Sequence, residues 1–249
     1  MIEAIHVYKE FNGKTVLNDI SFVFEQGKTN LIIGQSGSGK TVLMKCLVGL
    51  FPVDSGQVVF NGRVFSEISY GEKKKIRQEI GMLFQGGALF DSLSVEENVM
   101  FPLSMFTKQT LEENRERANF CLKRVNLENV NKLYPSEISG GMKKRVAIAR
   151  AISLNPKYLF CDEPNSGLDP TTSIVIDNLI SEITQEYQIT TIVNTHDMNS
   201  VIEIGDKIAF IYKGQLWWQG DKHDILHTDN KEINDFVYAT ELTRRLKGK

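Results

Sequence analysis

Residues 34–41 read Gly34-Gln35-Ser36-Gly37-Ser38-Gly39-Lys40-Thr41, between an apolar run that ends at Ile33 and a stretch of helical spacing that stops at Gly49. A glycine-rich turn between a buried strand and a helix lets backbone N–H groups close around phosphates. Lys40 would add a positive charge, and Thr41 a hydroxyl for Mg²⁺. A glycine turn with an incidental lysine is the alternative. The flanking strand and helix favour the first interpretation, so we expect this loop to bind Mg-ATP.

Further strand and helix patterns lie on both sides of the loop. Apolar runs predict strands at 80–84, 158–161, 189–193, 208–212 and 216–218, and helical spacing predicts a helix over 170–187. Asn61-Gly62, between two apolar runs, predicts a hairpin and therefore a small antiparallel layer. Alternation of strands with helices is typical of an α/β fold with a mostly parallel sheet.

The stretch from residue 86 to residue 155 is helical in character. Capping-box spacing, Ser94 with Glu97 and Thr110 with Glu113, predicts two helix starts there. We therefore expect a single domain over residues 1–249. Its expected parts are a catalytic core with the antiparallel layer (1–85 and 156–229), an inserted α-helical subdomain (86–155) and a C-terminal helix (230–249).

The composition argues against several classes of partner and location. The formal net charge is -2, so no overall basic field attracts nucleic acid or anionic lipid. The three cysteines lie at no metal-binding spacing, which predicts buried thiols in a reducing compartment. No stretch resembles a secretion signal or is long and apolar enough to cross a bilayer. The cytosol is the expected compartment, and any work at a membrane would need another chain as an anchor.

Two carboxylates end the strand predicted at 158–161. Asp162 would lie at the carboxyl edge of the sheet, where open α/β sheets bind ligands, and could hold Mg²⁺. Glu163 is the better candidate to activate an attacking water, because a second carboxylate beside the metal can accept a proton. A pair of solvated acids at a strand end is the alternative, and on these residues alone it is the more common case.

Three further features become informative only in combination. Ser139-Gly140-Gly141 precedes a helix-forming run and could form a second anion site, or simply an N-cap with a flexible glycine pair. The basic residues 143–145 predict a solvated helix face rather than a nucleic-acid patch. Gln85 and His196 each follow a predicted strand, and each alone would be an ordinary polar residue at a strand end.

The succession of these motifs resembles the ATP-binding cassette (ABC) family over nearly the whole chain. It runs through Gly34–Thr41, Gln85, Ser139-Gly140-Gly141, Asp162-Glu163, Ser166-Gly167-Leu168-Asp169 and His196. The resemblance implies a P-loop NTPase core with an inserted helical subdomain, and hydrolysis of Mg-ATP. The implied ATP contacts are Phe11, which would stack on adenine, Val16, residues 34–41, Val42 and Gln85. The implied Mg²⁺ contacts are Thr41, Gln85 and Asp162.

The resemblance also implies catalytic roles and a second copy of the chain. Glu163 would act on the attacking water, His196 would contact the γ-phosphate, and Lys40 would stabilise the charge that develops. The contacts made in trans, on ATP bound by the phosphate loop of a second copy, would be Ser139, Gly140, Gly141 and Asp169. One chain carries one phosphate loop and one Ser-Gly-Gly helix, so hydrolysis would require a dimer.

Within the family, the chain looks like the ATPase of the Mla/Mce phospholipid-transport systems. Two features carry this resemblance: the segment 84–95, which contains Gly87-Ala88-Leu89-Phe90, and the ending Gly140-Gly141-Met142. Met142 stands where the family usually has glutamine, and it cannot donate the hydrogen bonds of that residue. The segment Asn165-Ser166-Gly167-Leu168-Asp169 has the generic cassette form.

The preferred hypothesis is an ATPase subunit, peripheral on the cytoplasmic face of the inner membrane. It would power phospholipid movement through a separate integral permease, with an Mce-type lipid-binding protein as a further partner. The alternative within the family is the ATPase of a small-solute importer. A soluble cassette that acts as a switch on nucleic acid or ribosomes is a third hypothesis. The single cassette, the missing basic extension and the net charge of -2 argue against a nucleic-acid partner.

Overall fold

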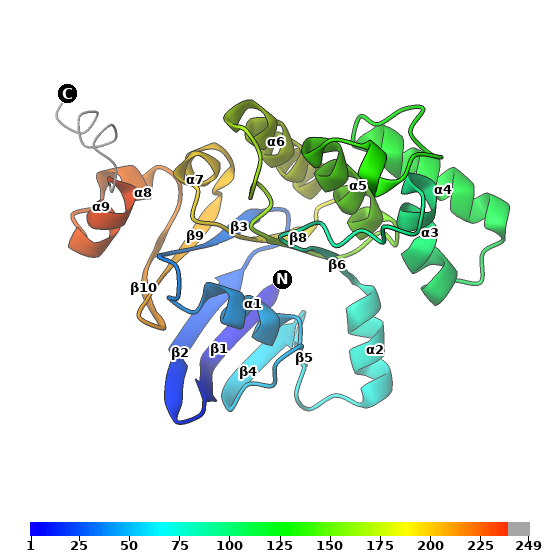
Figure 1. Ribbon diagram of the computed structural model, residues 1–249. Coiled ribbons are helices and arrows are strands. Elements are labelled where there is room, and N and C mark those ends of the chain that lie inside the picture. Colours follow the sequence, from blue (N-terminus) through cyan, green and yellow to red (C-terminus); the bar gives the residue numbers. More distant parts are fainter. Residues whose placement is uncertain (239–249) are drawn as a thin grey trace.

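The computed structural model describes residues 1–238, which form two β-sheets with helices packed around them (Figure 1). A six-stranded sheet has the order β10-β9-β3-β8-β7-β6, and a four-stranded sheet has the order β2-β1-β4-β5. The strands are β1 (Ile2–Phe11), β2 (Lys14–Phe24), β3 (Thr29–Ile33), β4 (Ser55–Phe60), β5 (Arg63–Val64), β6 (Ile80–Leu83), β7 (Tyr158–Asp162), β8 (Thr190–Asn194), β9 (Lys207–Tyr212) and β10 (Gln215–Gly220). The helices are α1 (Lys40–Leu47), α2 (Tyr70–Gln78), α3 (Val95–Phe106), α4 (Leu111–Arg124), the 3-10 turn η1 (Pro135–Glu137), α5 (Gly140–Ile152), α6 (Pro170–Glu186), α7 (Met198–Ile204), α8 (Asp224–His227) and α9 (Lys231–Val237).

The six-stranded sheet is mostly parallel, as predicted. β3 pairs with β8 and β9, and β7 pairs with β6 and β8, all in parallel, whereas β10 runs antiparallel to β9. Every residue of β3 and β8 is buried, because α5 and α6 cover one face of the sheet and α1 covers the other. The carboxyl ends of the parallel strands therefore meet at one edge, where ligands of such sheets bind.

The four-stranded sheet is antiparallel and packs on the far side of α1 (Figure 1). Phe24 and Phe60 of this sheet share a hydrophobic core with Leu43 of α1. β4 and β5 form the predicted hairpin, and Asn61 and Gly62 at its tip have φ angles of 46° and 76°, which suit the left-handed turn between twisted strands. α1 is thus held between two sheets, which fixes the loop that precedes it.

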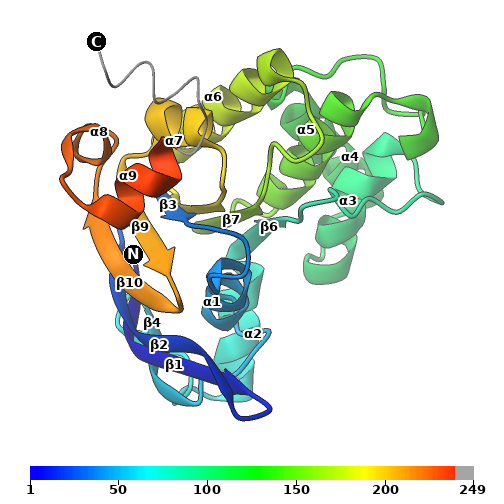
Figure 2. The ribbon, with the colours of Figure 1, turned by 60° about the vertical axis from the view of Figure 1, so that its left-hand side comes forward.

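α3, α4 and α5 pack against one another at one end of the molecule (Figure 2). The capping boxes predicted at Ser94 and Thr110 are both present. Asn98 of α3 is fully buried, and its side chain bonds the backbone of Phe90, Leu93 and Ser94, so the segment between β6 and α3 is held in place. The division into a core and a helical subdomain stays a prediction.

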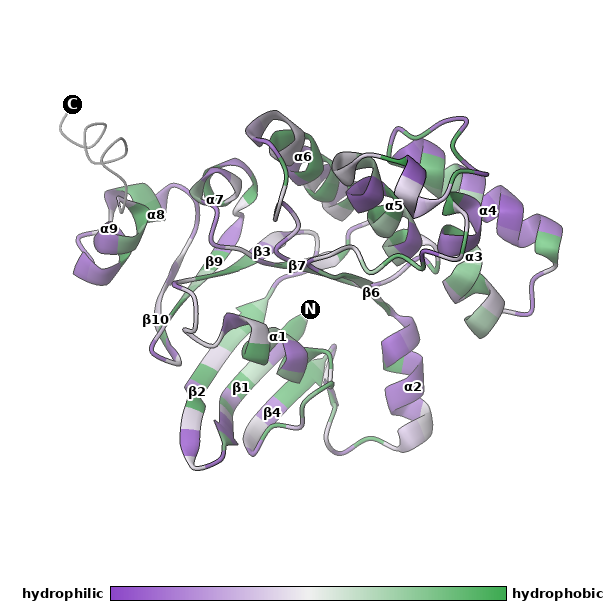
Figure 3. Cartoon of the chain, in the orientation of Figure 1, coloured by the Kyte–Doolittle hydropathy of each residue, from purple (hydrophilic) through white to green (hydrophobic). Residues whose placement is uncertain are grey.

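Sequence patterns missed three helices. α2 has a capping box, but it is mostly hydrophilic, and Ile76 is its one buried residue (Figure 3). Because it shows no apolar stripe, helical periodicity could not reveal it. α7 and α8 are too short for periodicity to reveal. α9 lies within the C-terminal helix predicted over 230–249, whose residues after 238 lie outside the described residues. Within residues 1–238, no helix has both the length and the apolar content to cross a membrane.

Candidate nucleotide site

The loop over residues 34–41 runs close against two other backbone segments. Gly34 has a φ of 145°, and a Cβ there would lie 2.2 Å from the carbonyl oxygen of Ile211 in β9. Gly39 has a φ of 108°, and a Cβ there would lie 3.0 Å from the carbonyl oxygen of Val16. Both positions therefore require glycine. The loop leads directly into α1, so the N-terminus of this helix, which favours anions, opens at the loop.

Lys40 and Ser38 are buried polar residues of this loop. The Lys40 ammonium donates to two carbonyl oxygens of the loop, at 2.8 and 3.1 Å. Burial lowers the pKa of Lys40 below its ordinary value, and the charges of Glu163 and Asp162 oppose that shift. The Ser38 hydroxyl is buried and has no hydrogen-bond partner within the described residues. An unpaired hydroxyl in the same loop as a buried cation fits a phosphate oxygen.

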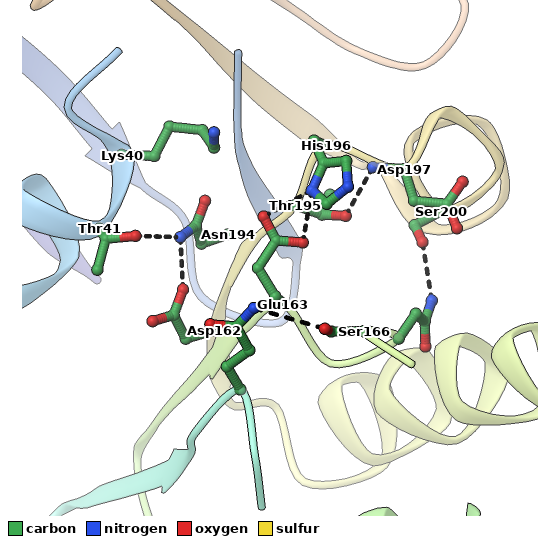
Figure 4. Close-up of polar contacts among 12 residues, drawn as sticks. Lys40, Thr41, Asp162, Glu163, Ser166, Asn194, Thr195, His196, Asp197 and Ser200 are labelled. Atoms are coloured by element: carbon green, nitrogen blue, oxygen red, sulfur yellow. Dashed lines mark hydrogen bonds and ion pairs between the residues drawn. The ribbon is translucent and has the colours of Figure 1, made fainter. Parts of the chain in front are cut away.

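Asp162 and Asn194 are the last residues of β7 and β8 and are neighbours in the parallel register. The Asn194 amide donates to Asp162 Oδ1 at 2.5 Å and to Thr41 Oγ1 at 3.2 Å, which brings these two oxygens to one place (Figure 4). Mg²⁺ prefers such oxygen ligands and completes its shell with water and phosphate oxygens. Among residues 1–238, no cluster of three or more His, Cys, Asp or Glu side chains could hold a metal. The residues present therefore fit Mg²⁺ that is bound together with a nucleotide.

Glu163 and His196 face each other at the same edge of the sheet (Figure 4). The Glu163 carboxylate lies 2.8 Å from His196 Nδ1. Glu163 has a left-handed φ of 48°, and its N–H donates to the Asn194 carbonyl at 2.9 Å, so the chain turns sharply where β7 ends. The Glu163 side chain is 15% exposed and that of His196 is 68% exposed. The carboxylate is thus sheltered, whereas the imidazole is open to a ligand.

Lys144 contradicts the solvated helix face predicted for residues 143–145. It is 5% exposed, because α5 packs against β6 and turns this side chain inward. Its ammonium donates to the backbone carbonyls of Gln85 and Glu163. The Gln85 side chain reaches Ser166 Oγ at 3.4 Å and makes no hydrogen bond to the predicted Mg²⁺ ligands. A Mg²⁺ contact of Gln85 therefore stays a prediction.

Residues 139–141 begin α5 and lie beside the turn that precedes α6. Ser139 is the N-cap of α5, and Asp169 is the N-cap of α6, so the capping alternative is present in the structure. Ser139 and Gly140 nevertheless remain exposed. Within residues 1–238, no hydrogen bond joins these residues to the loop over 34–41. A single chain thus presents two surfaces that could bind ATP without joining them.

Phe11 presents an aromatic ring at the end of β1. Phe11 is 38% exposed, and its ring stands edge-on to that of Phe51, with centroids 5.4 Å apart. The ammonium of Lys9, a buried residue, lies 5.2 Å from the centroid of the Phe11 ring. Val16, near the start of β2, and Val42, in the first turn of α1, are partly buried. A ring that is supported by neighbours yet open to solvent suits stacking on a base.

Comparison with known proteins identifies the family. A family model described as "ABC transporter" matches residues 17–166, which include the phosphate loop, Gln85, Ser139 and Glu163. The chain belongs to the ABC transporter family. This family membership confirms an ATP-binding subunit, the coarser part of the hypothesis drawn from the sequence.

The curated relatives of this ABC protein differ in the substrate that their names state. The chain is 38% identical to "Methionine import ATP-binding protein MetN" of Clostridium tetani, over 97% of this chain and 76% of that protein. It is 34% identical to "Probable ribonucleotide transport ATP-binding protein mkl" of Mycobacterium bovis, over 95% of this chain and 66% of that protein. It is 37% identical to "Protein TRIGALACTOSYLDIACYLGLYCEROL 3, chloroplastic" of Arabidopsis thaliana, over 95% of this chain and 73% of that protein. The chain therefore spans less than two thirds of the mycobacterial relative.

Solved structures confirm the predicted fold. The dimeric post-hydrolysis state of the ATP-binding cassette MJ0796, bound to ADP and Pi, has a TM-score of 0.80 and 30% identity, over 89% of this chain and 99% of that chain. The structure of cbiO1 from Clostridium perfringens, part of the ABC transporter complex cbiONQ, has a TM-score of 0.85 and 28% identity. The match covers 99% of this chain and 98% of that chain. This ABC protein is an ATPase that binds and hydrolyses Mg-ATP.

Asn194 was not identified from the sequence, although its place at the end of a strand beside Asp162 could have revealed it. We expect Asn194→Ala to raise the Mg²⁺ concentration for half-maximal ATPase activity about tenfold, because the amide orients the oxygens of Asp162 and Thr41. Asn30 is the matched control, a buried asparagine near the start of β3 whose side chain bonds only backbone groups. A Mg²⁺ titration in which Asn30→Ala shifts the midpoint equally would contradict the assignment.

Proposed function

We propose that this ABC ATPase works as a pair of identical chains that powers phospholipid transport through a separate membrane permease. One observation carries the pair: a single chain presents two surfaces that could bind ATP, and it does not join them. Residues 34–41, Asp162 and Glu163 form the first surface, and residues 139–141 with Asp169 form the second. The dimeric state of the solved cassette with ADP and Pi supports a second copy that completes each site.

The geometry supports specific roles in nucleotide binding. The exposed ring of Phe11 would stack on adenine, with Val16 and Val42 beside it. The loop N–H groups, the N-terminus of α1 and the Lys40 ammonium would hold the phosphates. Thr41 and Asp162, with Gln85, would hold Mg²⁺, which neutralises phosphate charge when it is bound. From the second copy, residues 139–141 and Asp169 would close over the same ATP.

Glu163 and His196 would carry the chemical step. The sheltered carboxylate of Glu163 would orient the attacking water and accept its proton. His196 would contact the γ-phosphate from its exposed face while its Nδ1 stays 2.8 Å from the carboxylate. Lys40 and the partner's Ser139 would stabilise charge on the transferred phosphoryl group. Hydrolysis would remove the contact that joins the two copies, and the dimer would reopen.

The lipid substrate rests on residues outside this chemistry. The segment 84–95 and Gly140-Gly141-Met142 resemble the Mla/Mce phospholipid-transport ATPases. The Arabidopsis relative is named after a galactose-bearing diacylglycerol lipid, which supports a lipid substrate in general. The name of the Clostridium relative, a methionine importer, favours a second candidate, the ATPase of a small-solute importer. The permease that co-purifies with the chain distinguishes the two.

Exposed apolar side chains near the Phe90–Phe101 ring pair would give the permease a docking surface. Its members follow β6 or lie on α3: Phe84, Phe90, Phe101, Met105 and Phe106, each 37% to 61% exposed. The Phe90 and Phe101 rings are 4.6 Å apart, and the buried Asn98 bonds both the backbone N–H and the carbonyl of Phe90. Exposed apolar patches of this kind mark interaction surfaces. Docking here would place the chain peripherally on the cytoplasmic face of the membrane, with an Mce-type protein as a further component.

Phe101→Glu should abolish capture of the membrane partner while ATP affinity stays unchanged, because a charge at the centre of an apolar interface must be buried unpaired. The measurement is affinity purification of the tagged chain from native membranes, with identification of co-purifying chains and lipids. Phe120→Glu on α4, also an exposed phenylalanine, is the matched control and should retain the partner. Recovery of a solute permease without an Mce-type protein would overturn the lipid assignment.

A further inference from the structure

A cluster of three buried polar side chains lies beside the Glu163–His196 pair. Asn165 follows β7 by three residues, Asp177 lies on α6 and Ser200 lies on α7. Their exposures are 9%, 2% and 0%. The Asn165 amide donates to Asp177 Oδ2 at 2.8 Å and to Ser200 Oγ at 2.9 Å. One amide therefore joins the loop after β7 to two helices.

Burying this cluster costs folding free energy. Asn165 Oδ1 and Asp177 Oδ1 are buried without a hydrogen-bond partner within the described residues. Burial raises the pKa of Asp177 to about 6; its bonds to Ser200 and Asn165 oppose the rise, and the charges of Asp197 and Glu203 add to it. Apolar side chains of similar volume in such a place are often neutral or stabilising. Packing alone thus gives no reason for these three residues.

The position of the cluster supplies a reason. Two polar bridges join the chain that leaves β7 to the chain that leaves β8. The outer bridge is the pair Glu163 and His196, and the inner bridge is Asn165 with Ser200. Glu163 has a left-handed backbone, which persists only where its surroundings hold it. In Figure 4, Ser200 lies beside Asp197, the N-cap of α7, which directly follows His196.

We propose that Asp177 and Ser200 are positioning residues for hydrolysis. They hold Asn165 so that the loop 163–169 and the segment leading into α7 keep the spacing at which Glu163 meets His196. Because Asp169 ends this loop, the same contacts of Asn165 would also fix the position from which Asp169 reaches ATP bound by a second copy. This inference rests on the roles proposed for Glu163 and His196.

The decisive variant replaces Asn165 and Asp177, two of the three members of the cluster, by apolar residues, Asn165→Leu with Asp177→Leu. The variant removes two buried groups that each carry an unpartnered oxygen and leaves only the Ser200 hydroxyl newly unpaired, so we expect the Tm to stay within about 4 °C of the wild type. We expect kcat for ATP to fall at least about tenfold while KM changes less than about twofold, because misplaced catalytic groups affect the chemical step rather than binding. The measurement is steady-state ATPase activity of the full chain, with a thermal melt in parallel.

A matched control lies at the other end of the same elements. Thr184 of α6 and Thr191 of β8 are fully buried and share a hydrogen bond of 2.6 Å. Thr184→Val with Thr191→Val removes that bond and should leave kcat unchanged. Asp177→Asn alone should retain at least half of the wild-type kcat, because the new amide oxygen still accepts from Asn165.

Several results would overturn the proposal. They are an unchanged kcat in the double leucine variant, a kcat that falls equally in the threonine control, and a KM that rises in step with the loss of kcat. If the double variant does not fold, Ser200→Ala decides: a lower kcat at unchanged KM supports the proposal, and an unchanged kcat refutes it. If Glu163→Gln retains full turnover, the role of Glu163 is wrong. If Glu163→Gln is inactive and the leucine variant is fully active, only the positioning role is wrong.

Discussion

Glu163→Gln should lower steady-state phosphate release at least about 100-fold while ATP affinity stays unchanged, since an amide cannot accept the proton of the attacking water. The substitution keeps the volume and a hydrogen-bonding oxygen, so the contact 2.8 Å from His196 Nδ1 can persist. The thermal stability should therefore match that of the wild type. The loss belongs to the chemical step alone.

The same variant should accumulate an ATP-bound dimer. Because two copies would close over ATP and reopen only after hydrolysis, blocking hydrolysis traps the closed pair. Gel filtration with and without Mg-ATP, together with a single-turnover assay, measures both effects. Glu203→Gln, an exposed acid on α7, is the control and should turn over and elute like the wild type. Normal turnover in Glu163→Gln would refute its assignment as the base.

Local patterns predicted the parts of the site that one segment builds by itself. The loop over 34–41 needs a strand, glycines and a helix in immediate succession, and all three are visible in the sequence. The placement of Asp162 and Glu163 followed from an apolar run that ends in two acids, since a buried parallel strand must deliver them to the ligand-binding edge. The hairpin at 61–62 and the capping boxes were equally local.

Contacts between distant segments were beyond these patterns. Lys144 looks like part of a basic surface, but the packing of α5 on β6 buries it against Gln85 and Glu163, which lie 59 and 19 residues away in sequence. Asn194, Asp177 and Ser200 are ordinary polar residues until the sheet and helices bring them together. Side-chain burial of this kind depends on the tertiary fold, which periodicity does not encode.

The transported substrate could not be predicted from the ATP site. The residues proposed to bind and hydrolyse ATP would be the same whatever the transporter moves, so the site leaves the transported substrate open. Relatives with similar identity carry names for methionine, ribonucleotide and lipid. If the permease docks as proposed, a difference in permease would act at the exposed Phe90 and Phe101 side chains.

Lys40→Ala should separate binding from stability. We expect ATP affinity to fall about 30- to 100-fold, because the variant loses a charge-assisted bond to phosphate. The free energy of unfolding without nucleotide should change by less than about 1 kcal/mol, since the lost bonds to two loop carbonyls are offset by relief of a buried charge. The lowered pKa of Lys40 shows that its burial disfavours the charged form.

Titration with a fluorescent ATP analogue and a thermal melt of the apo protein measure the two quantities independently. Lys45→Ala is the matched control on the same helix, because its ammonium lies 5.4 Å from the Phe51 ring and bonds no loop carbonyl. Equal loss of affinity in both variants would mean that net charge near α1, and not the position of Lys40, attracts ATP. Loss of affinity in Lys40→Ala alone, with an unchanged melt, would show that the chain holds this ammonium in the loop for phosphate and not for its own fold.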